Sequence, residues 1–152
     1  MDRVSRSKRS AIMSRVRSTG NVSTERRLRC ALMRAKLRGW RMHMKEVPGC
    51  PDFIFEADKV AVFVDGCFWH GCPQCHRRPK SNRKYWSNKI DSNILRDKRI
   101  NGILIEQGWK VLRFWEHSLH DLDEITERIS SETIQTKNPC PKCPNSASEV
   151  GV

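Results

Sequence analysis

Two short apolar runs separated by a polar turn constrain the fold of this chain more than any other feature. Phe53–Phe55 and Val60–Val64 have the length and residue types of β-strands, and the segment Glu-Ala-Asp-Lys between them is a natural hairpin turn. If this turn is centred on its middle residues, the numbers of two residues that face each other in the antiparallel pair add up to about 115 or 116. Asp52 then lies opposite residue 63 or 64 and beside Asp65, so two carboxylates meet at one end of a sheet.

The segments on either side of this hairpin predict an α/β fold. Apolar residues at helical spacing and helix-ending signals indicate a basic helix over residues 4–18 and further helices over 23–39, 81–107 and 119–129. Strand-like segments cover residues 40–44 and 109–114. We expect a single domain with a mixed central β-sheet flanked by helices. From about residue 131 onward Ser, Thr, Asn and Pro dominate, which predicts a mobile tail.

The inner faces of these elements should form the core. The expected core positions are Leu28, Ala31, Leu32 and Ala35 on the helix over 23–39, and Trp86, Ile90, Ile94, Ile103 and Leu104 on the long helix. We also place Trp40, Tyr85, Trp109 and Trp115 in the core. Cys30 and Cys50 are expected to be small buried residues.

The positive charge of the chain is concentrated in two blocks. Of the net formal charge of +12, residues 1–45 carry +12 and residues 76–113 carry +8, whereas residues 46–75 and 114–152 carry −4 each. This arrangement suggests that the basic segments bind a polyanion while carboxylates at the centre hold a metal ion against it. A merely solvated basic surface is the alternative, but segregated charge of this kind is typical of nucleic-acid-binding proteins.

Composition and motifs also exclude several classes of protein. The longest apolar run has five residues, far fewer than the ~18 needed to cross a bilayer. The N-terminus lacks an apolar stretch resembling a signal peptide. We therefore expect a cytoplasmic protein with no membrane association. The chain has no Gly-rich phosphate-binding loop of either nucleotide-binding type, so no nucleotide cofactor is expected.

The acidic pair at the end of the hairpin is a candidate catalytic site. Two carboxylates brought together repel each other, and the usual compensation is a divalent cation with oxygen ligands, commonly Mg²⁺ when the substrate is a phosphate. His70 follows Asp65 by five residues and can carry protons near neutral pH. The alternative is a pair of solvated acids at the strand ends, with His70 as a structural or surface residue.

Three cysteines close together form a candidate zinc site. Cys67, Cys72 and Cys75 lie within nine residues, and Cys-x₂-Cys spacing suits a tetrahedral zinc ion. The spacing leaves the fourth ligand open. A second pair, Cys140 and Cys143, could complete a four-cysteine ribbon with Cys72 and Cys75. Redox chemistry of the Cys-x₂-Cys pair is less favoured, because no βαβ unit follows Cys72.

The motifs of this sequence resemble those of the very-short-patch repair (Vsr) DNA mismatch endonucleases, a family of the PD-(D/E)xK nuclease superfamily. The resemblance covers about 115 residues and leaves out only the tail. It rests on Arg6-Ser7-Lys8-Arg9, Ser23-Thr24-Glu25, Pro51-Asp52, Val64-Asp65-Gly66-Cys67-Phe68-Trp69-His70, Lys80-Ser81-Asn82, Tyr85-Trp86, Lys89-Ile90, Asn93, Arg96-Asp97, Gly108-Trp109 and Trp115-Glu116-His117.

The resemblance implies an enzyme that nicks one strand of duplex DNA beside a T:G mismatch left by deamination of 5-methylcytosine, on the 5′ side of the mispaired thymine. It implies that Asp52 binds the catalytic Mg²⁺, that Glu25 reaches the site and that His70 assists as a proton carrier. Where related nucleases have Glu-x-Lys, this chain has Val64-Asp65-Gly66. Asp65 and a main-chain carbonyl near Val64 are therefore expected to replace the missing glutamate at the metal.

The same resemblance assigns the zinc site and the mismatch contacts. It favours His117 as the fourth ligand with Cys67, Cys72 and Cys75, in a structural site. A tryptophan is by default a core residue, but adjacent aromatic side chains on a polar loop suit a wedge that unstacks bases. The resemblance implies that Phe68, Trp69 and Trp86 intercalate beside the mismatch. Lys89, Asn93 and Arg96 on the long helix are expected at the DNA, with Lys89 and Asn93 facing the base pair.

We thus expect a basic DNA-contacting arm over residues 1–20, an endonuclease domain over 21–130 and a flexible tail over 131–152, acting as a monomer. Two other functions stay open from the sequence. One is a restriction or recombination nuclease of the same fold with another target. The other is a non-catalytic zinc module that binds nucleic acid, which is favoured if the acidic pair is only structural.

Overall fold

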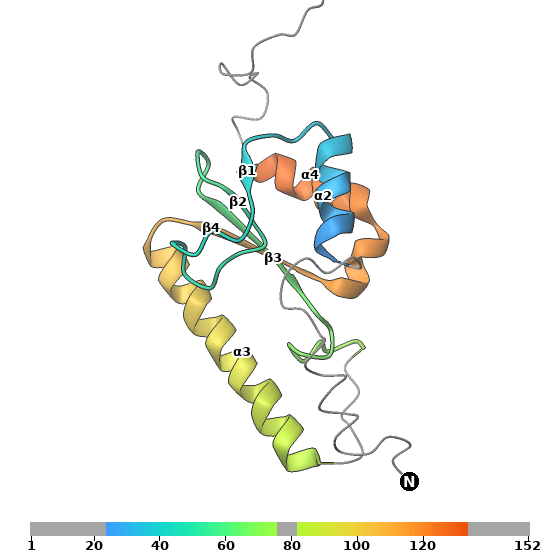
Figure 1. Ribbon diagram of the computed structural model, residues 1–152, viewed down its shortest axis with the longest axis vertical. Helices are drawn as coiled ribbons and strands as arrows, with labels where there is room; N and C mark the ends of the chain where they lie inside the picture. Colours follow the sequence, from blue (N-terminus) through green and yellow to red (C-terminus); the bar gives the residue numbers. More distant parts are fainter. Residues whose placement is uncertain (1–23, 76–81, 134–152) are drawn as a thin grey trace, which may run out of the picture.

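The computed structural model of the chain describes residues 24–75 and 82–133, which form both helices and strands (Figure 1). The predicted helix over residues 4–18, the arm over 1–20 and residues 134–152 of the predicted tail lie outside the described residues. The elements in chain order are α2 (Glu25–Arg34), β1 (Trp40–Arg41), β2 (Phe53–Phe55), β3 (Val60–Asp65), α3 (Arg83–Glu106), β4 (Lys110–Trp115), the 3₁₀ helix η1 (Glu116–His120) and α4 (Leu122–Glu132).

The four strands form one mixed sheet in the order β1-β2-β3-β4, which confirms the predicted α/β architecture. β1, β2 and β3 pair antiparallel, whereas β3 and β4 pair parallel. In the hairpin Phe53 pairs with Val62 and Phe55 with Val60. The numbers of paired residues add up to 115, which is one of the two values predicted from the position of the turn. This register brings the start of β2, preceded by Asp52, to the end of β3, where Asp65 lies.

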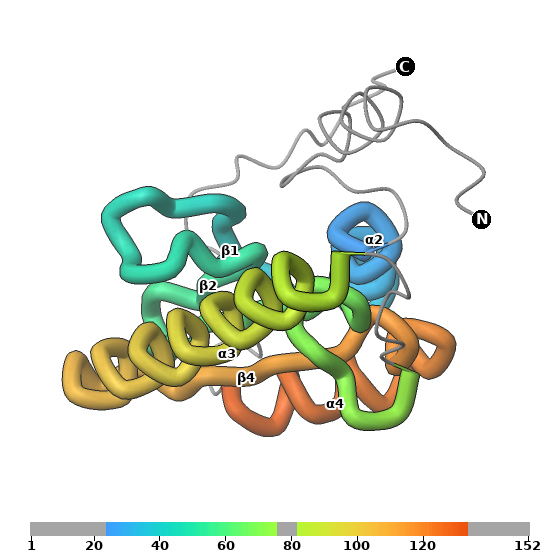
Figure 2. The backbone as a smooth tube through the Cα atoms, turned by 90° about the horizontal axis from the view of Figure 1, so that it is seen from below, coloured from blue at the N-terminus to red at the C-terminus, as the bar shows by residue number. Residues whose placement is uncertain are grey.

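Helices cover both faces of the sheet, and alternate strand residues therefore enter two separate cores. α3 lies along one face, while α2 and α4 pack together on the other (Figures 1 and 2). Phe53 and Val62 belong to the core beneath α2 and α4, with Leu28, Leu32, Ile125 and Ile129. Ile54 and Phe63 belong to the core beneath α3, with Leu104 and, at its margin, Ile100. The period of two along each strand explains this division.

Two elements differ in extent from the prediction. β1 ends at Arg41 instead of continuing to residue 44, and His43 has a φ of +50°, which lies outside the β region. The last helix was expected over 119–129, but the chain first forms η1 and then starts α4 at Leu122. The Asp121 carboxylate caps this helix by accepting a hydrogen bond from the Glu124 N–H at 3.1 Å.

Four predictions of burial were wrong. Ala35 is exposed and follows the last residue of α2 as its C-cap. Cys30 is exposed because it lies on the outer side of α2, away from Leu28 and Leu32, and Cys50 is exposed in the loop that precedes β2. Tyr85 is 61% exposed, because the first turns of α3 project beyond the sheet (Figure 1). Among the other aromatic residues, Trp40 and Trp109 pack against the two cores and Trp115 is partly buried.

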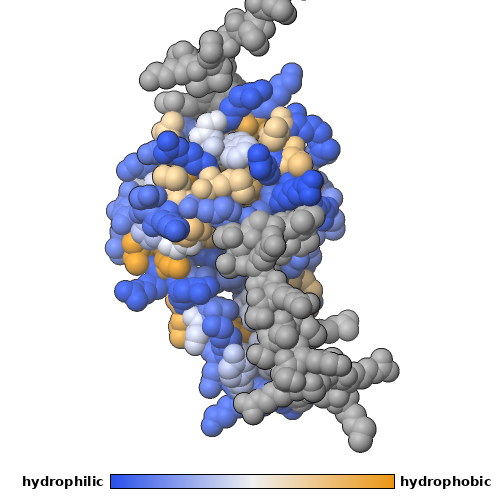
Figure 3. Space-filling model, viewed as in Figure 1, coloured by the Kyte–Doolittle hydropathy of each residue, from blue (hydrophilic) through white to orange (hydrophobic). Residues whose placement is uncertain are grey.

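One face of the described part is mainly polar. On the face shown in Figure 3 hydrophilic residues predominate, and apolar residues appear as small patches between them. Within residues 24–75 and 82–133, no helix is long and apolar enough to cross a membrane.

Candidate active site and cysteine cluster

The ends of β2 and β3 open into a pocket of about 770 Å³ that holds most of the predicted catalytic residues. Its walls come from the start of α2, the loop between β1 and β2, the loop after β3, and the middle of α3. The titratable groups at this pocket include Glu25, His43, Asp52, Asp65, His70 and Asp97. The tertiary structure thus brings together all four residues for which a catalytic role was predicted.

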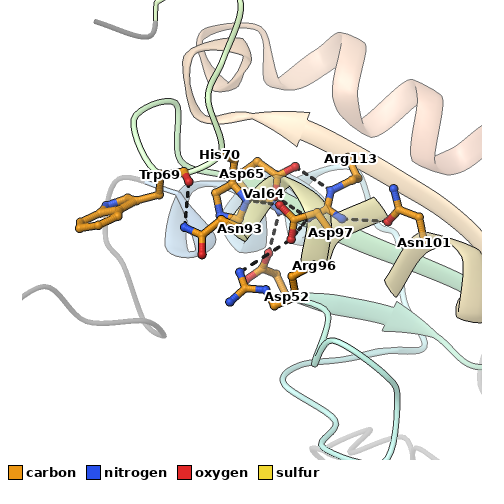
Figure 4. Close-up of polar contacts among 10 residues, drawn as sticks. All are labelled: Asp52, Val64, Asp65, Trp69, His70, Asn93, Arg96, Asp97, Asn101 and Arg113. Carbon is orange, nitrogen blue, oxygen red and sulfur yellow. Dashed lines mark hydrogen bonds and ion pairs between the residues drawn. The ribbon is translucent and has the colours of Figure 1, made fainter. Parts of the chain in front are cut away.

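Asp52 is held at the base of this pocket by the main chain of β3. Its Oδ2 accepts a hydrogen bond from the Val64 N–H at 2.7 Å (Figure 4). The pKa of Asp52 is raised to about 6, mainly by burial and in smaller part by the negative charges of Glu25 and Asp65, while the hydrogen bond from Val64 opposes the shift. A buried carboxylate with this environment is stabilised in its charged form by a nearby cation.

Glu25 and His43 lie beside Asp52 and form one group with it. Glu25 is the first residue of α2 and only 3% exposed. His43 Nε2 lies 2.9 Å from Glu25 Oε2. One ligand atom from each of the three residues lies within 4.8 Å of the others. The two carboxylates and the imidazole supply oxygen and nitrogen donors that fit a divalent cation.

Asp65 is paired with an arginine from the neighbouring strand. Arg113 Nε lies 2.7 Å from Asp65 Oδ2, and Arg113 Nη2 lies 2.8 Å from Asp65 Oδ1 (Figure 4). The guanidinium also lies 4.6 Å from the ring centroid of Phe63. Both carboxylate oxygens of Asp65 therefore accept charge-assisted hydrogen bonds. Its predicted role as a metal ligand stays a prediction.

His70 is oriented by Asp97 on α3. His70 Nδ1 lies 2.5 Å from Asp97 Oδ2 and 3.6 Å from Asp65 Oδ1. Arg113 continues the network with Nη2 3.3 Å from Asp97 Oδ1 and Nη1 2.8 Å from Asn101 Oδ1. If Nδ1 donates to Asp97, Nε2 is the ring nitrogen that can accept a proton.

The predicted DNA-contacting residues of α3 differ in their surroundings. Asn93 is only 7% exposed, and its side-chain amide donates to the Trp69 carbonyl at 2.9 Å. In this state Asn93 ties the loop after β3 to α3. Lys89 and Arg96 are exposed, and Arg96 Nη2 lies 3.7 Å from Asp97 Oδ1. Their predicted contacts with DNA stay predictions.

The predicted wedge residues form an aromatic cluster of their own. The ring centroids of Phe68 and Trp69 are 5.2 Å apart, those of Phe68 and Trp86 5.4 Å, and those of Trp69 and Trp86 5.8 Å. All three side chains are partly exposed, and they belong to neither described core. The indole of Trp69 points away from the acidic residues (Figure 4). Tyr85 extends the cluster, with its ring centroid 5.3 Å from that of Trp86.

The cysteine cluster lies where the sequence placed it and includes the predicted fourth ligand. His117 Nδ1 lies 3.2 Å from Cys67 Sγ, 3.6 Å from Cys72 Sγ and 3.2 Å from Cys75 Sγ. Cys75 Sγ lies 3.3 Å from Cys72 Sγ. A tetrahedral metal ion with bonds of about 2.0–2.3 Å has ligands about 3.3–3.8 Å apart. The observed separations lie within this range or about 0.1 Å below it, so the donor set suits such an ion. Cys140 and Cys143 lie outside the described residues.

Without a metal ion the pKa values of Cys72 and Cys75 are shifted in opposite directions. Hydrogen bonds with Cys67 and Cys72 raise the pKa of Cys75 to about 12. Burial raises the pKa of Cys72, but hydrogen bonds from Cys75 outweigh this effect and lower that pKa below its ordinary value. The Cys72 thiolate is thus favoured at the expense of Cys75, as expected where a cation normally supplies the missing positive charge.

Comparison with known proteins identifies the family. The family described as DNA mismatch endonuclease Vsr matches residues 1–77. The type II nicking enzyme V.XorIIP of Xanthomonas oryzae pv. oryzae is 39% identical over 130 residues, which cover 84% of this chain and 93% of the relative. The DNA mismatch endonuclease Vsr of Escherichia coli is 31% identical over 136 residues, which cover 88% of this chain and 83% of the relative. The chain belongs to the Vsr DNA mismatch endonuclease family.

As a Vsr protein the chain is a DNA endonuclease, and DNA is its partner. The type II nicking enzyme V.NmeDIP of Neisseria meningitidis serogroup C is a further relative, 41% identical over 121 residues that cover 78% of this chain and 80% of the relative. The segment that matches the Vsr family contains Glu25, Asp52, Asp65 and His70. The candidate catalytic residues therefore lie in the part of the chain by which the family is recognised.

Sequence reasoning assigned no role to four residues of this Vsr site. They are His43, Asp97, Asn101 and Arg113. For Arg113 the signal is the pairing of β3 with β4: Arg113 lies opposite Phe63 and therefore shares a sheet face with Phe63 and Asp65. That signal depends on the register of β3 and β4, which the sequence did not specify. For His43 no local pattern indicated the contact with Glu25.

Proposed function

We propose that this endonuclease nicks one strand of duplex DNA on the 5′ side of the thymine of a T:G mismatch arising from 5-methylcytosine deamination. The observation that carries the proposal is that one loop contributes residues both to the acidic pocket and to the aromatic cluster. The loop after β3 contributes His70 to the acidic pocket, and it contributes Phe68 and Trp69 to the exposed aromatic cluster. A cleavage site and a base-unstacking wedge are therefore mechanically linked.

The proposed chemistry is Mg²⁺-dependent hydrolysis of a phosphodiester. Asp52 would hold the ion, with the Val64 carbonyl and the other carboxylates of the pocket as candidate ligands. When bound, a divalent cation neutralises developing charge on the phosphate and lowers the pKa of a water molecule. His70 would carry a proton on Nε2, and Asp97 would keep the imidazole in the required orientation through the 2.5 Å contact with Nδ1.

The aromatic cluster supports mismatch recognition in this proposal. Phe68, Trp69 and Trp86 are in mutual contact, partly exposed and separate from the cores. Inserting such side chains between base pairs costs a few kcal/mol of unstacking, and the cost is lower at a mismatched step. Part of the preference for a T:G pair would therefore arise from the deformability of the DNA. Lys89 and Asn93 would contribute the contacts with the mismatched bases.

The cysteine cluster would serve this function as a structural zinc site. Four protein ligands, Cys67, Cys72, Cys75 and His117, leave a tetrahedral zinc ion no open position for water. The site joins the loop after β3 to η1 and would fix the loop that carries Phe68, Trp69 and His70. We also propose that the protein acts as a monomer.

A nicking assay tests the proposed function. Duplexes that differ only in one base pair, T:G or matched C:G, are labelled on each strand and incubated with the full-length protein and Mg²⁺. We expect a cut in the thymine strand alone, 5′ to the mismatch, that EDTA prevents. Equal cutting of the matched duplex would instead indicate a restriction-type nuclease of the same fold. Salt-sensitive binding without cutting would indicate a non-catalytic module.

A further inference from the structure

We propose that the divalent cation of the active site is bound among Glu25, His43 and Asp52, with His43 as a nitrogen ligand. Asp65 belongs to a separate cluster, with His70 and Asp97, that orients His70 and holds no cation. This inference rests on the proposed metal-dependent hydrolysis and specifies where the ion lies. It differs from the sequence prediction, in which Asp52 and Asp65 share the ion.

The separations within the first cluster suit adjacent ligands of an octahedral ion. Two such ligands with bonds of about 2.1 Å lie about 3.0 Å apart, and His43 Nε2 lies 2.9 Å from Glu25 Oε2. The ligand atoms of Glu25, His43 and Asp52 all lie within 4.8 Å of one another. An ion can therefore enter with small side-chain movements and replace the hydrogen bond between His43 and Glu25.

The backbone at His43 has an unusual conformation. His43 has a φ of +50°, a left-handed conformation that few non-glycine residues adopt. Such strain persists where the surrounding structure requires it, and it is common at functional sites. Cys50, in the same loop and also at the pocket, has a φ of +49°. Opposite this loop the first turn of α2 supplies Glu25.

The second cluster already contains its positive charge. Arg113 makes two hydrogen bonds with the Asp65 carboxylate and lies 3.3 Å from Asp97. A divalent ion between Asp65 and Asp97 would have to displace a guanidinium or be placed beside it, and like charges at this distance repel. In the first cluster Asp52 accepts a hydrogen bond from the main-chain N–H of Val64, and Glu25 contacts the imidazole of His43.

The nitrogen donor has a consequence for metal preference. Both ions bind carboxylate, carbonyl and water oxygens, but an imidazole nitrogen adds more to the affinity for Mn²⁺, a transition-metal ion, than to that for the harder Mg²⁺. The site should therefore bind Mn²⁺ more tightly than Mg²⁺, and His43 should be responsible for a large part of the difference. Mn²⁺ is also paramagnetic, so that coupling between its electron spin and an imidazole nitrogen can be observed directly.

The test is Mn²⁺ binding to the zinc-loaded, full-length protein without DNA. Electron spin echo envelope modulation should show ¹⁴N coupling in the wild type. The coupling should disappear in His43→Asn and remain in His70→Asn. Asparagine tolerates the left-handed backbone at position 43, and the two variants make the same chemical change in the two rival clusters. His43→Asn should weaken Mn²⁺ affinity about 10-fold or more and Mg²⁺ affinity less, while His120→Asn, an exposed control, should change neither.

The inference is overturned if wild-type protein binds Mn²⁺ without ¹⁴N coupling, or if His70→Asn loses the coupling and His43→Asn keeps it. The wild-type spectrum decides even if a variant folds poorly. The nicking assay is separate from this result. Mismatch nicking with an ion bound elsewhere would refute only the assignment to His43, whereas absence of nicking with ¹⁴N coupling intact would refute the proposed function and leave the metal site standing.

Discussion

Arg113 on β4 holds the Asp65 carboxylate of β3 through two N–H···O contacts of 2.7 and 2.8 Å. The two residues come from adjacent parallel strands and point to the face covered by α3, where the same guanidinium reaches Asp97 and Asn101. Asp97 in turn contacts His70. The position of His70, the candidate proton carrier, therefore depends on Arg113, whose side chain is 19% exposed.

Replacing this arginine should reduce both stability and activity. Arg113→Gln leaves Asp65 and Asp97 without their shared cation, and breaking a pair of this kind costs up to about 3 kcal/mol of unfolding free energy. Nicking of T:G duplex should fall ~10-fold or more, because His70 loses its fixed orientation. Urea unfolding and single-turnover nicking measure the two effects.

Arg41→Gln is the matched control: its ion pair with Glu56 is exposed and should contribute less than about 1 kcal/mol. Equal effects of the two substitutions would show that the Arg113 network has no special role.

Asp52→Asn should abolish nicking while DNA binding is kept or becomes tighter. The substitution removes a proposed metal ligand and a negative charge that faces the phosphate backbone, but it leaves the basic segments unchanged. Gel-shift titrations and nicking rates on the same T:G duplex check this. Parallel loss of binding and nicking would instead mean that Asp52 has a structural role.

The raised pKa of Asp52 also predicts a pH dependence of stability in the absence of divalent cations. Its pKa is about 6 in the folded protein against 3.8 ordinarily, so the folded state retains a proton that the unfolded state has lost. The contribution of Asp52 is greatest below pH 4 and is lost as the pH rises through 6. Asp52→Asn should therefore be more stable than wild type at pH 8 by about 1–3 kcal/mol, and the difference should shrink toward pH 4. Urea unfolding of both proteins at several pH values measures it. A constant difference would contradict the assignment.

The zinc prediction separates the two possible ligand sets. A chain truncated after Thr133, the last described residue, should keep one tightly bound zinc ion, whereas His117→Asn should lose it or bind it far more weakly. His120→Asn is the control, because His120 lies in the same 3₁₀ helix but outside the cluster. Elemental analysis after dialysis against a chelator gives the zinc content. Loss of zinc on truncation would favour the ribbon with Cys140 and Cys143.

The aromatic cluster predicts a selective loss of mismatch cleavage. Trp69→Ala and Trp86→Ala should stay folded and zinc-loaded but lose T:G nicking by ~10-fold or more, since stacking of an aromatic side chain on a base contributes about 1–3 kcal/mol. Binding to matched duplex should change little. Trp40→Ala is the matched control: Trp40 packs edge-on against Phe53 in the core, so this variant should melt early. Early melting of Trp69→Ala or Trp86→Ala would assign that residue to structure.

Local patterns in the sequence were sufficient for the hairpin and for three of the four cysteine-cluster ligands. Alternation and turn length determine which residues of β2 and β3 face each other, because the strand repeat is two and the turn is short. The spacing of Cys67, Cys72 and Cys75 likewise confines three sulfurs to one loop. The family of the chain was also evident from its motifs, and so was the meeting of Asp52 with the end of β3.

The partners of these residues were decided by the tertiary structure. His43 meets Glu25 across 18 positions of sequence, His70 meets Asp97 across 27, and Asp65 meets Arg113 across 48. These contacts depend on the parallel register of β3 and β4 and on the packing of α3 and α2 against the sheet, which no local periodicity encodes. Whether Asp65 pairs with Arg113 or binds a metal ion is therefore decided only when β3 pairs with β4 and α3 docks on the sheet, because these two events determine which charges share the buried space.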